Sequence, residues 1–183
     1  MNKILLSTAL VAGLGVAALA PRTASAANTV GDGTITITGT VNSSTCKING
    51  GNGPATIDVA LPTVSTTSLN AAGAVAGRTP FSIALTGCGS LTKATTFFEP
   101  GPTVLSDGHL KNASGNATGV EVELLNNDFS SINLAGAPGS QNSQQATLAS
   151  GAATLNYYAQ YYATAAAGAG SVSTSVQFTM LYQ

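Results

Sequence analysis

Cys46 and Cys88 are the side chains with the widest range of possible chemistry, and they are the only cysteines in a chain of 183 residues. A cysteine thiolate can attack a substrate, bind a metal ion or form a disulfide. A metal site is not predicted, because two thiols and one distant His109 do not give ligand spacing. Gly87 and Gly89 make the surroundings of Cys88 look like a nucleophile loop, but a sulfur held in a disulfide cannot attack. In a secreted chain, one Cys46–Cys88 disulfide is the simplest interpretation.

The histidine and the acidic side chains give no catalytic arrangement either. His109 ends the turn-like sequence of residues 106–109, where we expect a surface loop. Glu121 and Glu123 are two residues apart on a predicted strand, so we expect them on one solvated face with no base close to them. The glycines form no phosphate-binding or dinucleotide-binding motif. We therefore predict no catalytic residue, no cofactor and no metal site.

Two polar features could serve recognition. Asn42, Asn112 and Asn116 each begin a triplet that matches a glycosylation acceptor, but a chain rich in Asn, Ser and Thr produces such triplets by chance. Residues 157–162 contain four tyrosines, whose rings could stack on a sugar. We favour burial of these rings in the core or in a packing interface.

Residues 1–26 have the three parts of a secretory signal peptide. Lys3 supplies the positive start, residues 4–20 form an uncharged apolar run, and residues 24–26 are a small-x-small cleavage motif. The apolar run of 17 residues is shorter than the roughly 20 residues that a membrane-spanning helix needs. We expect a mature chain that begins at Ala27 and contains no integral membrane segment.

The predicted mature chain carries little charge. Of the six Lys and Arg residues, Lys3 and Arg22 leave with the signal, so four face seven Asp and Glu residues, a net charge near −3. This balance gives no basic surface for nucleic acid or an anionic membrane. Charged residues make up 7% of the chain, whereas an average domain has about 25%. The composition indicates the neutral polar surface of an extracellular β-protein that lies against copies of itself.

Short strands are the dominant pattern in the rest of the chain. Apolar residues alternate with polar ones between clusters of Gly, Pro, Asn and Ser, which predicts about eight or nine strands. The predicted strands after Cys46 are residues 57–61, 81–85, 95–99, 120–124, 132–134, 154–163 and 175–183, of which 95–99 is a short strand, 132–134 returns as a hairpin and 154–163 is a long aromatic strand. Cys88 is out of phase with residues 81–85, so that strand should end or bulge near Gly87. Glycines interrupt the Ala-rich pieces 71–76 and 163–169, which argues against helices. The pattern predicts one all-β domain and favours an immunoglobulin-like β-sandwich.

Residues 34–41 form the cleanest alternating segment. Ile35, Ile37, Gly39 and Val41 point one way, and four threonines point the other. Such a segment could be the first strand of its own domain, or an arm that completes another molecule. The pattern alone favours an ordinary first strand, and the rest of the chain reverses this preference.

The order and spacing of several motifs resemble the major structural pilins of chaperone-usher (type 1) fimbriae. The matching features are the signal peptide, the sequence G-T-I-T-I-T-G-T-V before Cys46, and P-F-S-I-A-L-T-G before Cys88. At the carboxyl end, Tyr182 is penultimate and Gly170 is fourteenth from the end, where pilins of this family typically carry Tyr and Gly. The resemblance covers essentially the whole chain.

This resemblance implies an immunoglobulin-like sandwich of residues 43–183 that lacks its last strand, preceded by a donor arm of residues 27–42. It also implies that a periplasmic chaperone fills the open site first, and that the arm of the next subunit replaces the chaperone at the outer-membrane usher. The donor strand would be about residues 29–42, with an inserting face of Val30, Ile35, Ile37, Gly39 and Val41. The acceptor groove and chaperone-binding edge would be about residues 171–183, with Gly170, Val176, Phe178, Met180 and Tyr182. Gly33 stands where some relatives carry a larger apolar residue, which leaves the register of that end open.

The implied function is that of a structural subunit of an extracellular fimbrium, exported through the periplasm and serving adhesion and biofilm formation. Its partners would be neighbouring copies of itself, the chaperone and the usher. The alternatives are a minor or tip-associated adhesin and a secreted carbohydrate-binding β-sandwich. A tip adhesin of this family needs an additional receptor-binding domain and has no donor arm, whereas this chain has the arm and lacks the room. An enzyme would need a base, nucleophile or metal site that the sequence does not offer.

Overall fold

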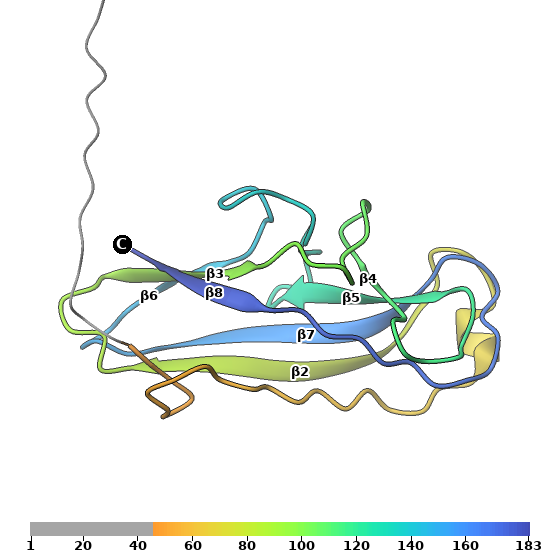
Figure 1. Cartoon of the computed structure of the whole chain (residues 1–183), viewed down its shortest axis with the longest axis horizontal. Coiled ribbons are helices and arrows are strands. Elements are labelled where there is room, and N and C mark those ends of the chain that lie inside the picture. The colour runs from red at the N-terminus through yellow and green to blue at the C-terminus, as the bar shows by residue number, and fades with distance from the viewer. Residues whose placement is uncertain (1–45) are drawn as a thin grey trace, which may run out of the picture. The chain divides into compact units, whose positions relative to one another are not determined.

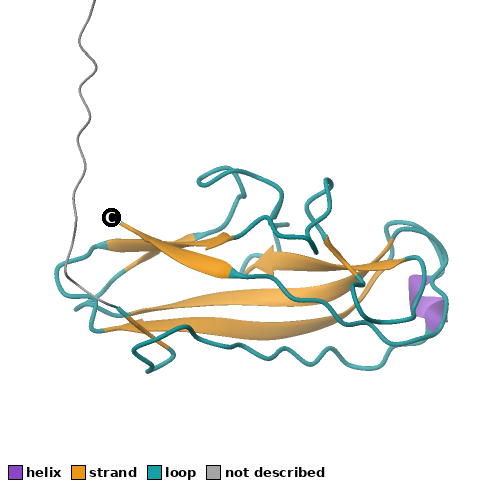
Figure 2. Ribbon diagram, viewed as in Figure 1, coloured by secondary structure: helices purple, strands orange, loops and turns teal. Residues whose placement is uncertain are grey.

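The structure is a computed structural model that describes residues 46–183, and strands dominate this part of the chain (Figures 1 and 2). The predicted signal peptide and donor arm lie outside the described residues. One sheet has the strand order β1-β2-β7-β5-β4 and the other has the order β6-β3-β8. The strands are β1 Lys47–Ile48, β2 Val75–Thr86, β3 Lys93–Phe98, β4 Leu110–Lys111, β5 Val120–Asn126, β6 Gln145–Thr147, β7 Ala153–Ala163 and β8 Phe178–Tyr182. All pairs are antiparallel, which confirms the predicted all-β class.

The centre of the five-stranded sheet is the pair of long strands β2 and β7. They pair from Val75 opposite Tyr162 to Leu85 opposite Ala153. The alternation of residues 81–85 correctly predicts the buried face, where Ile83 and Leu85 point into the core. β2 ends at Thr86, and Gly87 takes a φ of +66°, a backbone conformation that favours glycine. The strand thus ends near Gly87, as the sequence predicts, and the change of phase directs Cys88 into the core.

Three predicted strands differ from the structure. Residues 57–61 alternate between inward and outward side chains but pair with no strand of the described chain. Residues 132–134 form no named strand, although an isolated bridge joins Ser131 to Leu125 and Ile132 N–H donates to the carbonyl of Leu124. The last strand begins at Phe178 rather than at Ser175. The alternation records burial on one side in all three segments, but a strand also needs a continuous ladder of backbone bonds. Residues 57–61 make no such bond to a described residue, whereas residues 132–134 and 175–177 make only isolated ones.

The helical content of residues 46–183 is one 3₁₀ turn, η1 Thr66–Leu69, which the sequence pattern did not reveal. Ser65 caps this turn by accepting a hydrogen bond from the backbone N–H of Thr67 at 3.3 Å. The Ala-rich pieces 71–76 and 163–169 are not helical. Within the described residues, no helix is long and apolar enough to cross a membrane.

Tyr157 lies in the middle of the core between the two sheets. Its side chain is fully buried and contacts the rings of Phe81 and Phe98, with centroids 5.5 and 5.6 Å away. Its hydroxyl donates a hydrogen bond to Thr96 Oγ1 at 2.9 Å, and the Thr96 hydroxyl donates in turn to Met180 Sδ at 3.6 Å. These contacts tie β7 of one sheet to β3 and β8 of the other.

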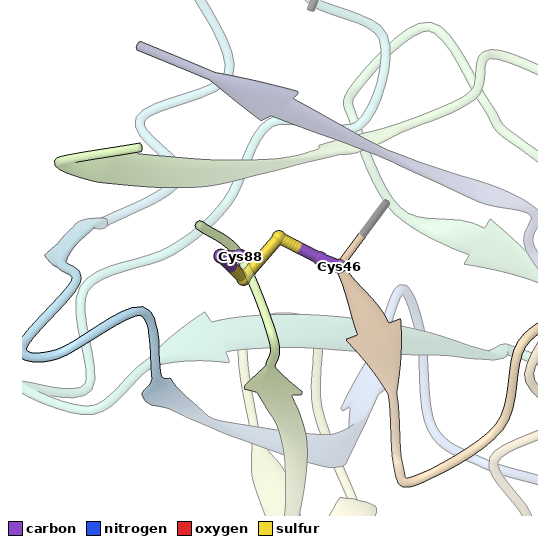
Figure 3. The surroundings of a disulfide bond; sticks show 2 residues. All are labelled: Cys46 and Cys88. Atoms are coloured by element: carbon purple, nitrogen blue, oxygen red, sulfur yellow. A yellow bond between two sulfur atoms is a disulfide. The ribbon is translucent and has the colours of Figure 1, made fainter. Parts of the chain in front are cut away.

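A disulfide joins Cys46 to Cys88, as predicted (Figure 3). Cys46 immediately precedes β1, and Cys88 follows β2, so the bond fastens two chain segments at one end of the sandwich. The carboxyl terminus lies at this same end, where the backbone N–H groups of Thr92 and Lys93 donate to the carbonyl of Gln183. We call it the cysteine end, and we call the opposite end, with Leu69, the η1 end.

Candidate functional site

The carboxyl-terminal segment of residues 171–183 is hydrogen-bonded along one edge over its whole length. β8 pairs with β3, and the segment before β8 is held by other groups on the same side. The carbonyls of alternate residues accept the following bonds: Ser171 from Ala117 N–H, Ser173 from Ala113 N–H, Ser175 from the Thr103 hydroxyl, and Gln177 from Glu99 N–H. This blue segment runs from the η1 end to the carboxyl terminus in Figure 1.

The opposite edge of residues 171–183 has no pairing partner among the described residues. The backbone N–H and C=O of one residue point to the same side of a strand, and the side changes at each residue. Since the odd-numbered residues bond toward β3, the even-numbered residues 172–182 direct their backbone groups away from it. β8 is an edge strand of its sheet. This edge, which we call the acceptor edge, therefore offers a row of unused donors and acceptors.

The same even-numbered residues turn their side chains toward the core. Val172, Val176, Phe178 and Tyr182 are half-buried against the main core cluster, and Met180 is buried within it. The odd-numbered residues between them are exposed. The acceptor edge thus combines an unpaired backbone with an inward apolar row.

A second unpaired segment, residues 53–64, packs against the same core. It makes no backbone hydrogen bond to another described residue. Ile57, Val59 and Leu61 are half-buried against the core cluster that Val176 and Phe178 also contact. The segment is drawn in orange to yellow and follows β2 in Figure 1. Two extended segments with unused backbone groups therefore border one apolar core, which is an arrangement that can accept a further strand.

Two asparagine side chains hold the start of the C-terminal segment, where no strand of residues 46–183 pairs with it. Asn112 accepts from Ser173 N–H at 2.9 Å and donates to the Ser171 carbonyl at 3.0 Å. Asn116 accepts from Ser171 N–H at 2.7 Å. A Cβ on Gly170 would lie 2.5 Å from the backbone nitrogen of Ala117, so the close approach of the two segments needs glycine there. Both polar atoms of Asn112 are engaged in hydrogen bonds within the domain. This side chain therefore serves to hold the segment rather than to carry a glycan.

The prediction of a solvated face for the two glutamates is wrong. Glu123 is only 8% exposed and accepts a hydrogen bond from Gln160, which in turn accepts one from Arg78. Glu121 Oε2 lies 3.1 Å from His109 Nδ1, so a base is close to it and His109 is not a free surface side chain. Burial raises the pKa of Glu121, although the hydrogen bond from His109 opposes this effect. The sequence pattern did not reveal this group of polar side chains because its members come from four different segments. They are Arg78, His109, Glu121, Glu123 and Gln160.

Asp107, His109 and Glu121 form one cluster of metal-ligating groups within the described residues. Their ligand atoms lie within 4.8 Å of one another. However, His109 Nδ1 is already bonded to Glu121, and the His109 ring lies against Tyr162 with centroids 4.4 Å apart. These groups are therefore already engaged with one another. A cation bound here would have to displace the hydrogen bond between His109 and Glu121.

The tyrosines of β7 have separate roles. Tyr157 is in the core, as we favoured, whereas Tyr158 lies half-buried on the other face against Phe129. Phe129 is 50% exposed, has a φ of +67°, and lies 4.3 Å beneath the guanidinium of Arg78. This group is an exposed aromatic and cationic contact on the surface of the five-stranded sheet.

The residues predicted for assembly divide into two groups. Val176, Phe178, Met180 and Tyr182 lie together on the acceptor edge, and Gly170 lies just before it. The donor residues Val30, Ile35, Ile37, Gly39 and Val41 lie outside the described residues. The sequence pattern did not identify residues 53–64 as an unpaired segment. It also did not reveal that Asn112 and Asn116 hold Ser171 and Ser173 at the start of the C-terminal segment.

Comparison with known proteins gives a consistent picture. The family model FimA, described as type-1 fimbrial protein, A, matches residues 61–183. The major fimbrial subunit SMF-1 of Stenotrophomonas maltophilia is 51% identical over 172 residues, which cover 90% of this chain and 98% of that protein. The F17 fimbrial protein of Escherichia coli is 39% identical over 178 residues, covering 93% and 96%. The minor fimbrial subunit HifD of Haemophilus influenzae is 35% identical over 165 residues, covering 82% and 74%.

Solved structures agree in fold. A chaperone-usher pilus structure, described in connection with rod uncoiling, matches with a TM-score of 0.56 and 23% identity, covering 84% of this chain and 96% of that one. The P pilus rod subunit PapA matches with a TM-score of 0.56 and 21% identity, covering 76% and 99%. The sandwich is thus the immunoglobulin-like fold of these pilins, and the matched family is one of structural subunits rather than enzymes. The chain belongs to the type-1 fimbrial protein family and is a subunit of surface fimbriae.

Proposed function

We propose that this subunit polymerises by donor-strand complementation, with residues 29–42 of one copy inserted beside the acceptor edge of another. The observation that carries the proposal is the one-sided bonding of residues 171–183, whose even-numbered residues combine unused backbone groups with an inward apolar row. An unpaired edge of this kind is normally an aggregation hazard. In a fimbrial subunit it is a site for strand addition, where the main chain contributes affinity and alternate side chains contribute specificity.

The length of the arm suits this role. Fourteen extended residues span about 45 Å, and the acceptor edge of residues 171–183 is of similar length. Ile35, Ile37 and Val41 would add apolar side chains to the core that Ile57, Val59 and Leu61 border from the other side. The inserted strand would then join the two sheets and supply the last strand of the sandwich.

The direction of the inserted strand follows from where the arm begins. Only three residues separate the arm from Cys46, so the arm leaves its own subunit at the cysteine end. If the inserted strand is antiparallel to β8, its residue 42 lies near Ser171, at the η1 end of the acceptor. The cysteine end of one subunit then meets the η1 end of the next, a head-to-tail contact that repeats without limit. A parallel strand would instead bring two cysteine ends together.

Before assembly, a periplasmic chaperone would cover the acceptor edge, and the outer-membrane usher would be the place of exchange. Support for these partners is chemical: an isolated subunit would expose both apolar side chains and unpaired backbone groups on this edge. The proposed partners are therefore a chaperone that offers a strand, the usher, and neighbouring copies of the subunit.

Adjacent substitutions in the arm test this proposal. Ile37→Asp should abolish fibre assembly, because an uncompensated carboxylate would have to enter an apolar site. Thr36→Asp is the matched control and should assemble far better, because in strand phase Thr36 faces away from the acceptor. Both variants should still accumulate with the chaperone. Equal impairment of assembly, measured by electron microscopy and by the yield of polymer, would show that residues 34–41 belong to their own domain.

Whether this subunit builds the shaft is tested separately. Relatives include both a major and a minor fimbrial subunit, and we propose that this chain is the major one. Cells that lack its gene should show no fibres in the electron microscope. Fibres of normal length and number in those cells would instead identify a minor subunit.

A further inference from the structure

The chain contains two Asn-Gly sequences, and both lie in one short loop after β1. Asn49-Gly50 and Asn52-Gly53 are separated by a single residue. In an Asn-Gly sequence the backbone nitrogen of the glycine can attack the asparagine side-chain amide, because no Cβ atom on the glycine hinders the approach. All of residues 49–53 are exposed. The loop therefore holds two chemically similar sites, and their surroundings decide which of them reacts.

Asn49 has a structural role that fixes its side chain. The backbone N–H of Gly51 donates to the carbonyl of Ile48 at 3.0 Å and closes a tight turn. Asn49 and Gly50 are the central residues of this turn, with φ angles of +49° and +78°, and turns with two positive φ angles favour Asn-Gly. The side-chain oxygen of Asn49 accepts a hydrogen bond from Ala84 N–H at 2.9 Å. Attack on Asn49 would therefore require its side chain to leave this partner on β2.

Asn52 has no comparable constraint. Neither its side chain nor the backbone N–H of Gly53 makes a hydrogen bond to another described residue. A Cβ atom on Gly53 would meet nothing within 4 Å, so the reacting groups have open space around them. The φ of Asn52 is not positive, so the turn geometry that favours asparagine at position 49 does not apply here. Asn52 can adopt the rotamer that ring closure needs without breaking a bond to residues 46–183.

We propose that Asn52 is a site of spontaneous deamidation in the folded subunit, and that the fold protects Asn49. The backbone nitrogen of Gly53 attacks Cγ of Asn52, and the new C–N bond closes a succinimide ring. The Cγ–Nδ2 bond breaks, and ammonia leaves with the proton that the Gly53 nitrogen gives up. Water then opens the ring at either carbonyl and leaves aspartate or isoaspartate at position 52. The net reaction consumes water, releases ammonia and involves no oxidation or reduction.

The reaction would change the charge of a surface that has few charges. The predicted mature chain has a net charge near −3, so one new carboxylate per subunit gives a net charge near −4. Isoaspartate also routes the main chain through the former side chain, which lengthens the loop by one carbon atom. β1 pairs with β2 next to the disulfide, so the new charge lies close to the cysteine end. Negative charge would then accumulate there as a fibre ages, however the subunits are joined.

Peptide mapping of aged fibres tests the proposal. Full-length fibres are incubated at neutral pH in water labelled with a heavy oxygen isotope, which enters each carboxyl group formed during the incubation. Digestion in ordinary water leaves later conversion unlabelled. Trypsin cleaves after Lys47 and Arg78 and releases residues 48–78 as one peptide, whose fragmentation separates the two asparagines. Labelled carboxylate should appear about ten times faster at Asn52 than at Asn49, the factor that corresponds to breaking a well-formed hydrogen bond.

Unfolding gives the matched control. In subunits unfolded with guanidinium, the two Asn-Gly sequences lose their different surroundings, and their conversion rates should become similar. Equal rates in folded fibres would overturn the protection of Asn49 by its bond to Ala84. Faster conversion at Asn49, or no labelled carboxylate at Asn52 even at mildly alkaline pH, would overturn the proposed site.

A variant of the attacking residue tests the chemistry. Gly53→Ala places a Cβ atom beside the attacking nitrogen but in open space. It should slow conversion of Asn52 several-fold and leave both the Asn49 rate and the unfolding midpoint of the fibres unchanged. An unchanged rate at Asn52 in this variant would contradict attack by the backbone nitrogen of residue 53.

Discussion

Removing the disulfide should cost this subunit a large part of its stability. Cys46 and Cys88 are 42 residues apart, and a bridge across such a loop stabilises by about 4 kcal/mol in the chain-entropy model. Domains of this size are stable by about 5–15 kcal/mol. The double variant Cys46→Ala with Cys88→Ala should therefore lose about a quarter to four fifths of the total, and its level in the periplasm should fall sharply. The double replacement avoids leaving one reactive thiol.

The measurement is a guanidinium titration of assembled fibres, followed by circular dichroism because the chain contains no tryptophan. Wild-type fibres treated with a reductant should unfold near the midpoint of the double variant. Ser90→Ala, at an exposed position close to Cys88, is the control and should leave the midpoint unchanged. A loss smaller than about 1 kcal/mol would contradict the estimate, since the loop-closure model predicts about four times more. If two thiols per subunit could be labelled after denaturation without a reductant, the disulfide would be absent and the estimate would have no basis.

Three further outcomes are expected. Tyr157→Phe should destabilise fibres by about 1 kcal/mol in the same titration, because it removes the hydrogen bond to Thr96 and keeps the packing; no change would mean that this bond contributes nothing. Burial raises the pKa of Glu121, so its contribution to stability is full below the unfolded-state pKa and is lost as pH rises through the folded-state pKa. Glu121→Gln should accordingly flatten the decline in stability above about pH 4.3, and an unchanged profile of midpoint against pH would contradict this sign. Finally, the subunit expressed without a chaperone should aggregate and co-expression should rescue it, whereas a fully stable monomer with an empty acceptor edge would refute the open-edge arrangement.

The core strands were predictable from sequence because each one carries a local signal. Residues 81–85 and 154–163 alternate with period two, and one face of each is buried. The break at Gly87 was equally local, since Cys88 falls out of phase. Such features need no knowledge of which strands are neighbours.

Features that depend on neighbours were not predictable. The burial of Glu123 requires Gln160 and Arg78, which come from β7 and β2. Residues 57–61 have the pattern of a strand, yet they lack a partner backbone among the described residues, and the pattern does not reveal this. The register of the predicted donor arm is also not decided by its pattern. Val30 is out of phase with Ile35, so the two share a face only if the strand is irregular near Gly33.

The disulfide has a mechanical consequence for a fibre linked through its arms. If the subunits are linked through their arms as proposed, tension on an arm would enter its own subunit at Cys46, and the disulfide would pass the load directly to Cys88. The covalent path would then bypass the intervening residues 47–87, with β1, η1 and β2. The load continues into β3, which holds β8 along its length. On the accepting side, an arm beside β8 would be pulled along its own axis, so its hydrogen bonds, which lie across the strands, would be sheared together rather than unzipped one after another.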